Sequence, residues 1–226
     1  MLTPTVWSPA ARRTGPVRVP ACGPWTAPRC SRPPPLSSSA CWRGSARDQW
    51  AQPGLGEWDV RGLAGHTARA ILTVETYLLA EPPARRTIDD APAYYRALAG
   101  TVADPTQVAR RGVEAGVRLG DAPAEVVAQD LARATALLAA QPRDRLVAIG
   151  AHALELREYL RTRVLELVVH TLDLSRATGI PHGLPAEAVE ASCALAGALA
   201  ARAGRAEELL MALGGREQLA AGFSVV

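Results

Sequence analysis

The chain is poor in several residue types, and each shortage excludes a class of protein. It contains no Lys and no Asn, so its 25 basic residues are all Arg, and aromatic residues make up only 4% of the 226 positions. No apolar run approaches the roughly 18–20 residues that a membrane-spanning helix needs. The N-terminus also lacks the apolar core of a secretory signal. We therefore expect a soluble, cytoplasmic protein without a membrane segment.

The charge is divided unevenly along the chain. Residues 1–50 hold seven of the 25 Arg and one of the 22 acidic residues, which gives this segment a net charge of +6 and the remainder −3. A nucleic-acid-binding domain needs a basic face on its folded part. Because the remainder is mildly acidic, we expect no nucleic-acid partner.

Residues 1–49 differ in composition from the rest of the chain. Nine of the 18 Pro and three of the four Cys lie there, and the run SRPPPLSSS has neither a helical nor a strand period. The segment is a disordered basic tail, a transit peptide, or the product of a mis-assigned reading frame. Cys22, Cys30 and Cys41 lack the close spacing of a zinc site. We predict two parts: this irregular segment, and a helical domain over residues 50–226.

Ala and Leu dominate the second part, which predicts an all-α fold. Asp59, Asp104 and Asp121 are expected N-caps, and Gly120 and Gly179 are expected helix stops. Residues 142–154 are predicted to form a loop or a brief extended segment, and residues 216–226 (REQLAAGFSVV) an irregular tail. Helices are predicted over residues 60–79, 91–99, 105–119, 122–140, 155–178 and 185–203, followed by a shorter helix that ends at Leu213.

The predicted helix over residues 155–178 contains one polar line among apolar residues. Arg163, Glu166, His170 and Asp173 are spaced by three, four and three residues, which follows the 3.6-residue turn. The surrounding Val and Leu residues predict that the helix is buried nearly all round. A buried polar line must be paired internally, bind a metal ion or face a wet cavity, because an unpaired buried carboxylate is costly.

Glu166 and His170 lie one turn apart, which suits two side chains that bind one ion. His66, on or beside the buried face of the 60–79 helix, is the candidate third ligand. Two imidazoles and one carboxylate form a donor set typical of catalytic zinc, with a position open to water or substrate. Asp173 would then orient His170, and Arg163 would balance Glu166. The alternative is an ion-free ladder of Arg163–Glu166 and His170–Asp173 pairs.

Two segments resemble a known family. GLGEWDVRGLAGHTARAILTVETYL is similar to the W-x-V-x-x-L-x-x-H opening of the metal-binding domain of mycothiol-dependent maleylpyruvate isomerases, in the DinB/YfiT-like superfamily. RTRVLELVVHTLDLSRATG resembles its second signature, R-x-x-E-x-x-x-H-x-x-D-L-x-x-A-x-G. The resemblance covers about Trp50 to Gly179. It implies a DinB-like four-helix bundle, here followed by extra C-terminal helices.

The resemblance also implies a chemistry. It makes His66, Glu166 and His170 the ligands of a divalent metal ion, typically Zn²⁺, and mycothiol or another low-molecular-weight thiol the co-substrate. The thiolate would add to an activated cis double bond, allow rotation and leave, or would be transferred to a small electrophile. A non-catalytic metal-binding sensor or interaction module, and a damaged gene product, are the alternatives.

Four other residues carry structural expectations. Cys193 is expected to be a small core residue, so that the reactive thiol is external. Trp58 is expected to pack rather than to take part in chemistry, and Arg110-Arg111 to be solvated.

Overall fold

The structure is a computed structural model that describes residues 49–98 and 104–226. The expectation of an irregular segment over residues 1–49 therefore falls, except for Gln49, outside the described residues. Within them the fold is all-α, as predicted: seven helices (α2–α8) are accompanied by four short strands. No described helix is both long enough and apolar enough to cross a bilayer.

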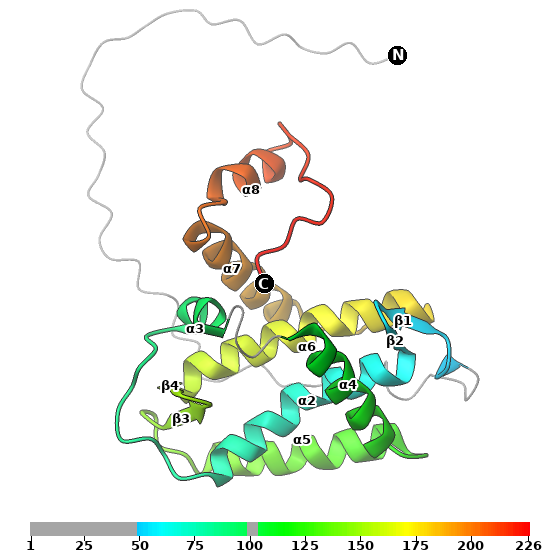
Figure 1. The fold of residues 1–226 in the computed structure, drawn as a ribbon, viewed down its shortest axis with the longest axis vertical. Helices are drawn as coiled ribbons and strands as arrows, with labels where there is room; N and C mark the ends of the chain where they lie inside the picture. Colours follow the sequence, from blue (N-terminus) through cyan, green and yellow to red (C-terminus); the bar gives the residue numbers. More distant parts are fainter. Residues whose placement is uncertain (1–48, 99–103) are drawn as a thin grey trace, which may run out of the picture. The chain divides into compact units, whose positions relative to one another are not determined.

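Helix α2, Val60–Leu79, is the central element of the bundle. It follows a small antiparallel pair, β1 (Pro53–Leu55) and β2 (Trp58–Asp59). The carboxylate of Asp59 caps it by accepting a hydrogen bond from the Gly62 amide at 2.7 Å, as predicted. Helices α4, α5 and α6 all pack against α2 (Figure 1), which makes the four-helix arrangement of a DinB-like fold.

The contact between α2 and α4 is unusually close beside the candidate ligand His66. A Cβ atom added to Gly65 would lie 2.0 Å from the backbone nitrogen of Gly116, so only glycine allows this approach. The α4 backbone therefore fixes the position of α2 at this level of the bundle.

Three helices follow α2: α3 (Ala91–Leu98), α4 (Pro105–Arg118) and α5 (Pro123–Ala139). Asp104 caps α4 as predicted, by accepting from the Gln107 amide at 3.0 Å. The predicted cap Asp121 is wrong. Ala122 occupies that position without a side-chain hydrogen bond, because Pro123 is the first residue of α5 and sets where the helix begins.

The segment predicted as a loop or a brief extended stretch is a β-hairpin. Strands β3 (Leu146–Ile149) and β4 (His152–Glu155) pair antiparallel around Gly150, which has a φ of 59°. Val147, Ile149 and Leu154 of this hairpin belong to the main core, together with apolar residues of α2.

Helix α6, Leu156–Thr178, carries the polar line and ends at Gly179 in the left-handed conformation (φ 71°), as predicted. It runs antiparallel to α2, because Thr73 lies beside Tyr159 and His66 beside His170. The prediction that it is buried nearly all round is only partly correct. Val169 is 40% exposed, so one side of α6 is open to solvent at this position.

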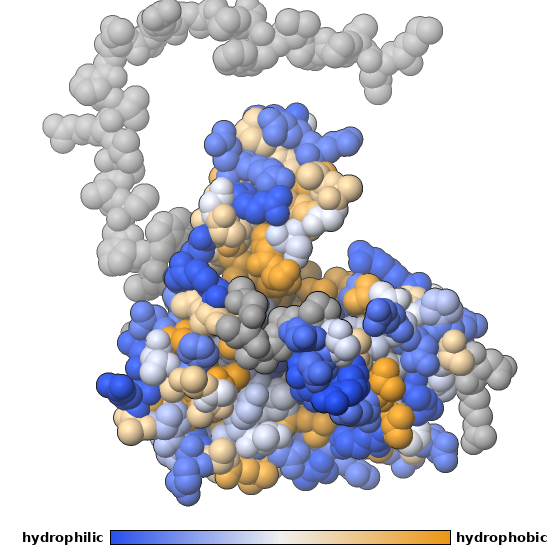
Figure 2. Space-filling view, in the orientation of Figure 1, coloured by the Kyte–Doolittle hydropathy of each residue, from blue (hydrophilic) through white to orange (hydrophobic). Residues whose placement is uncertain are grey.

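Two further helices, α7 (Ala186–Arg202) and α8 (Ala206–Leu213), complete the described chain. Leu195 and Leu199 on α7 form a small core with Leu165 of α6, whereas α8 contributes no buried residue. Figure 2 shows apolar and charged side chains next to one another over α8. The prediction that Cys193 is a core residue is wrong: it lies on the exposed side of α7.

Candidate metal centre

The structure brings His66, Glu166 and His170 together from two helices. Each offers a ligand atom, and these atoms all lie within 4.8 Å of one another. The ring centroids of His66 and His170 are 4.7 Å apart, and His170 Nε2 is 3.3 Å from Glu166 Oε2. No other such group of His, Cys, Asp or Glu side chains occurs within residues 49–98 and 104–226.

The two α6 members of this group are held by neighbouring side chains. The hydroxyl of Tyr95, on α3, donates to Glu166 Oε1 at 3.0 Å. His170 Nδ1 donates to Asp173 Oδ2 at 3.2 Å, which is the orienting contact expected from the sequence. Both contacts leave the second oxygen of Glu166 and the Nε2 atom of His170 directed towards the same point.

His66 is held by packing instead. Its ring stacks on Trp58 with centroids 4.4 Å apart, and Trp58 is itself fixed by donating from Nε1 to the carbonyl of Ala109 at 2.8 Å. Nδ1 of His66 is buried and has no hydrogen-bond partner. An unpaired buried nitrogen is costly, so a ligand for it is the expected explanation.

Burial and charge set the protonation states of the group. Burial lowers the pKa of His66 to about 4, with a further contribution from His170. Burial alone would raise the pKa of Glu166, but hydrogen bonding to His170, the nearby Arg163 charge and Tyr95 together lower it to about 2. The pKa of His170 is raised by Glu166 and Asp173, against the effect of burial. Near neutral pH, His66 is thus a neutral imidazole and Glu166 a carboxylate, which are the forms that bind metals.

The donor set fits a divalent ion. Two imidazoles and one carboxylate match the three-ligand sets that zinc uses where a fourth position stays open. The unpartnered Nδ1 of His66 and the carboxylate bond that orients His170 are both features of such sites.

Arg163 does not pair with Glu166. Its Nε donates to Thr162 Oγ1 at 3.0 Å, its Nη2 lies 3.5 Å from the Tyr94 hydroxyl, and its guanidinium lies 4.9 Å from the ring centroid of Tyr159. Its influence on Glu166 is electrostatic only. The alternative without a metal ion required two side-chain pairs. The His170–Asp173 pair is present, and the Arg163–Glu166 pair is absent.

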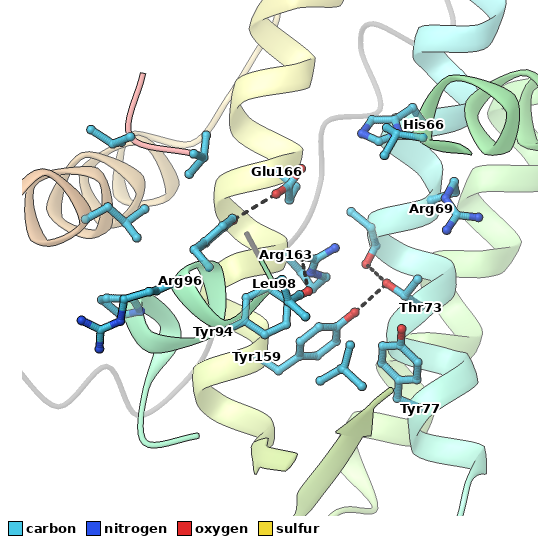
Figure 3. Close-up of a pocket in the computed structure, with 18 of the residues that line it drawn as sticks. His66, Arg69, Thr73, Tyr77, Tyr94, Arg96, Leu98, Tyr159, Arg163 and Glu166 are labelled. Carbon is cyan, nitrogen blue, oxygen red and sulfur yellow. Dashed lines mark hydrogen bonds between the residues drawn. The ribbon is translucent and has the colours of Figure 1, made fainter. Parts of the chain in front are cut away.

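A cavity of about 610 Å³ adjoins the group, with His66 and Glu166 in its wall. Figure 3 shows His66, Arg69, Thr73 and Tyr77 along α2, opposite Tyr159, Arg163 and Glu166 along α6. Tyr94 and Tyr95 from α3, and Leu199 and Arg202 from α7, also line it. The cavity is therefore bounded mainly by aromatic rings and guanidinium groups. Among the described residues that line it, Glu166 is the single acidic side chain.

Sequence reasoning missed several of these residues. Tyr95 lies on a short helix with no polar spacing that would connect it to Glu166, 71 residues further along the chain. Arg111, expected to be solvated, is half-buried and lines the cavity, whereas its neighbour Arg110 is exposed as predicted. Trp58 does pack, but its partner is a candidate ligand.

The fold and the site define a helical bundle with a His/Glu/His group at the edge of a cavity. The model of the mycothiol maleylpyruvate isomerase N-terminal domain family matches residues 38–175. The chain belongs to this family, as the two sequence signatures indicated. Searches of curated proteins and of solved structures gave no match.

Proposed function

We propose that the domain over residues 50–226 binds a divalent metal ion and uses a low-molecular-weight thiol of the mycothiol type to isomerise or S-conjugate a small electrophile. The observation that carries the proposal is the convergence of His66, Glu166 and His170, of which His66 and Glu166 lie in the wall of a cavity of about 610 Å³. Membership of a family named for a mycothiol-dependent isomerase supports the choice of thiol.

These three side chains would hold the ion, and Zn²⁺ is the ion that best suits two imidazoles and one carboxylate. Such an ion lowers the pKa of a thiol that binds it, so that the thiolate is available near neutral pH. Tyr95 and Asp173 keep Glu166 and His170 in place before any ligand arrives.

The thiol comes from outside the protein. Cys193 is exposed on α7 and does not line the cavity. No other cysteine occurs within residues 49–98 and 104–226. The cavity has room for a small electrophile next to the three ligands.

In isomerisation, the thiolate adds to an electron-poor cis double bond and the electron pair moves onto the adjacent carbonyl oxygen. Rotation about the resulting single bond follows, and return of the electron pair expels the thiolate and leaves the trans isomer. Arg163 and the Tyr94 hydroxyl line the cavity together and supply hydrogen-bond donors for the oxygen that gains charge. In S-transfer, the thiolate instead displaces a leaving group, which departs with its electron pair.

Thiol-dependent turnover tests this proposal. Full-length protein loaded with zinc is mixed with mycothiol and either monochlorobimane or maleylpyruvate, and conjugation is followed by fluorescence and isomerisation by NMR of the alkene protons. We expect turnover in at least one assay, loss of it in His170→Ala, and retention in Arg157→Gln, a control at an exposed position of α6 away from the ligands. A zinc-loaded protein without thiol-dependent turnover would instead be a non-catalytic metal-binding module.

A further inference from the structure

Trp58 lies in a slot between α2 and α4 that two glycines leave open. A Cβ atom added to Gly112 of α4 would lie 2.6 Å from Nε1 of Trp58, and one added to Gly62 of α2 would lie 2.9 Å from Cδ1. Because the bundle is close-packed, a larger residue at either position would have to push the indole out of its place. Both helices are therefore shaped around one aromatic ring.

A hydrogen bond fixes the indole within this slot. Nε1 of Trp58 donates to the carbonyl oxygen of Ala109 on α4 at 2.8 Å, and an indole has no second polar atom with which to replace that bond. The slot also sits on a rigid seam, because the backbones of α2 and α4 meet closely at Gly65 and Gly116. The two helices together set the plane of the indole ring.

His66 rests on the face of this fixed ring. The imidazole and the indole are stacked with centroids 4.4 Å apart and an interplanar angle of 29°. Hydrogen bonds orient Glu166 and His170, whereas Nδ1 of His66 has no hydrogen-bond partner. In most metal sites a hydrogen bond to the second ring nitrogen orients a histidine ligand. At His66 the stacking contact takes the place of that bond.

We infer that Trp58 is a positioning residue for the metal site, because its face sets the orientation of the His66 ring. The inference rests on the metal-binding part of the proposed function. It also gives α4, which carries none of the three ligands, a part in metal affinity, since Ala109 and Gly112 of this helix hold the indole.

Zinc affinity of the full-length protein, measured by competition with a fluorescent chelator, tests the role of the ring. Trp58→Leu should weaken binding by about 10- to 100-fold, the range for groups that orient a histidine ligand. Trp58→Phe should restore most of the affinity, because a flat ring remains although the bond to Ala109 is lost. The matched control is Trp50→Leu, which should bind zinc as wild type does, since Trp50 packs on the same core but contacts Arg61 instead of a ligand.

Gly112→Ala tests the part of α4 while it keeps Trp58 and all three ligands in the chain. The added methyl group displaces the indole, so zinc binding should again weaken by about 10-fold. In Gly197→Ala, the control on α7, the methyl group meets nothing within 4 Å, and the affinity should not change. Combining Gly112→Ala with Trp58→Phe should cost less than the sum of the two single losses, because both act through the same ring.

Two further measurements separate positioning from a general loss of stability. Urea unfolding of metal-free protein should show that Trp58→Leu and Trp50→Leu are both destabilised, although only the first binds zinc more weakly. Co²⁺ in place of zinc gives visible absorption bands that depend on coordination geometry, and these should change in Trp58→Leu but not in Trp50→Leu.

An unchanged zinc affinity and cobalt spectrum in Trp58→Leu would overturn the inference and leave the metal site standing. An equal loss of affinity in Trp50→Leu would overturn it as well, because the effect would then follow stability. Wild-type protein that takes up neither metal would overturn the metal-binding proposal itself, and the inference with it.

Discussion

The two helices that line the cavity differ in how their polar groups are satisfied. On α6, Glu166 and His170 each have hydrogen-bond partners in the protein. On α2, the Nδ1 atom of His66 has none, and neither does the guanidinium group of Arg69 among the residues that the structure describes. The α6 wall is therefore organised by the protein itself, whereas the α2 wall presents two polar groups that have no partner among the described residues.

This difference separates the effects on stability from those on binding. A group that is already satisfied contributes to folding without a ligand, and its removal leaves a partner unpaired. A group without a partner costs folding free energy until its ligand arrives. Substitutions on the two helices should thus have opposite effects in metal-free protein.

The largest expected effect is the difference in the free energy of unfolding between Glu166→Gln and His66→Phe in metal-free protein. Glu166→Gln should lower the free energy of unfolding by about 2–3 kcal/mol, because it weakens the bonds to His170 and Tyr95. His66→Phe should leave it unchanged or raise it by up to about 1 kcal/mol, because it keeps the stacking on Trp58 and removes an unpaired nitrogen. Urea unfolding after chelator treatment measures both, and equal losses would remove the distinction between the two helices.

The pH dependence of metal-free protein should show the same contrast. The pKa of His66 is lowered from 6.5 to about 4, so the unfolded chain takes up a proton between these values that the folded chain does not. Stability should therefore fall by about 2 kcal/mol between pH 6.5 and 4, after allowance for partial exposure. The pKa of His170 is raised, so its contribution is present below pH 6.5 and is lost as the pH rises through the raised value.

Urea unfolding at a series of pH values checks this prediction, with His66→Phe as the matched variant. The variant should lose less stability than wild type between pH 6.5 and 4.5. Parallel profiles for the two proteins would show that His66 is not held in the neutral form.

A smaller effect is expected from the residues that orient the α6 ligands. Tyr95→Phe and Asp173→Asn should each weaken zinc binding by about 10-fold, at the lower end of the range for groups that hold a ligand in place. Competition with a fluorescent chelator measures the affinity. Unchanged affinity in both variants would mean that Glu166 and His170 do not need these contacts to bind zinc.

The smallest effect is expected for Cys193→Ala. Cys193 is exposed, on α7 and outside the cavity wall, so stability should change by less than about 0.5 kcal/mol. Zinc affinity and any thiol-dependent turnover should be unchanged. A loss of turnover would instead make Cys193 the source of the thiol.

The sequence predicted the α6 side of the site better than the α2 side. Glu166, His170 and Asp173 lie on one helix, where the 3.6-residue period determines which side chains share a face. His66 was a candidate because it lies on or beside the buried face of its own helix, and the family resemblance added support, but no local pattern states which helix packs against which. The close contact at Gly65, which helps to place α2, depends on the α4 backbone and is invisible in either segment alone.

The wrong predictions of burial have a common cause. Cys193 and Arg111 were assigned from average burial of their residue types, yet burial depends on which side of α7 or α4 is covered. Tyr95 and Arg69 are ordinary residues of amphipathic helices until the cavity between them is known. Helix ends, in contrast, were predictable at Asp59 and Gly179, because capping is a local property.

The most direct test is the zinc content of the full-length protein after chelator treatment, titration with zinc and dialysis. Wild type should retain one zinc ion per chain, whereas His66→Phe and Glu166→Gln should each retain far less, because one ligand comes from α2 and the other from α6. Retention of one equivalent by His66→Phe, or no retention by wild type, would contradict a site shared between the two helices.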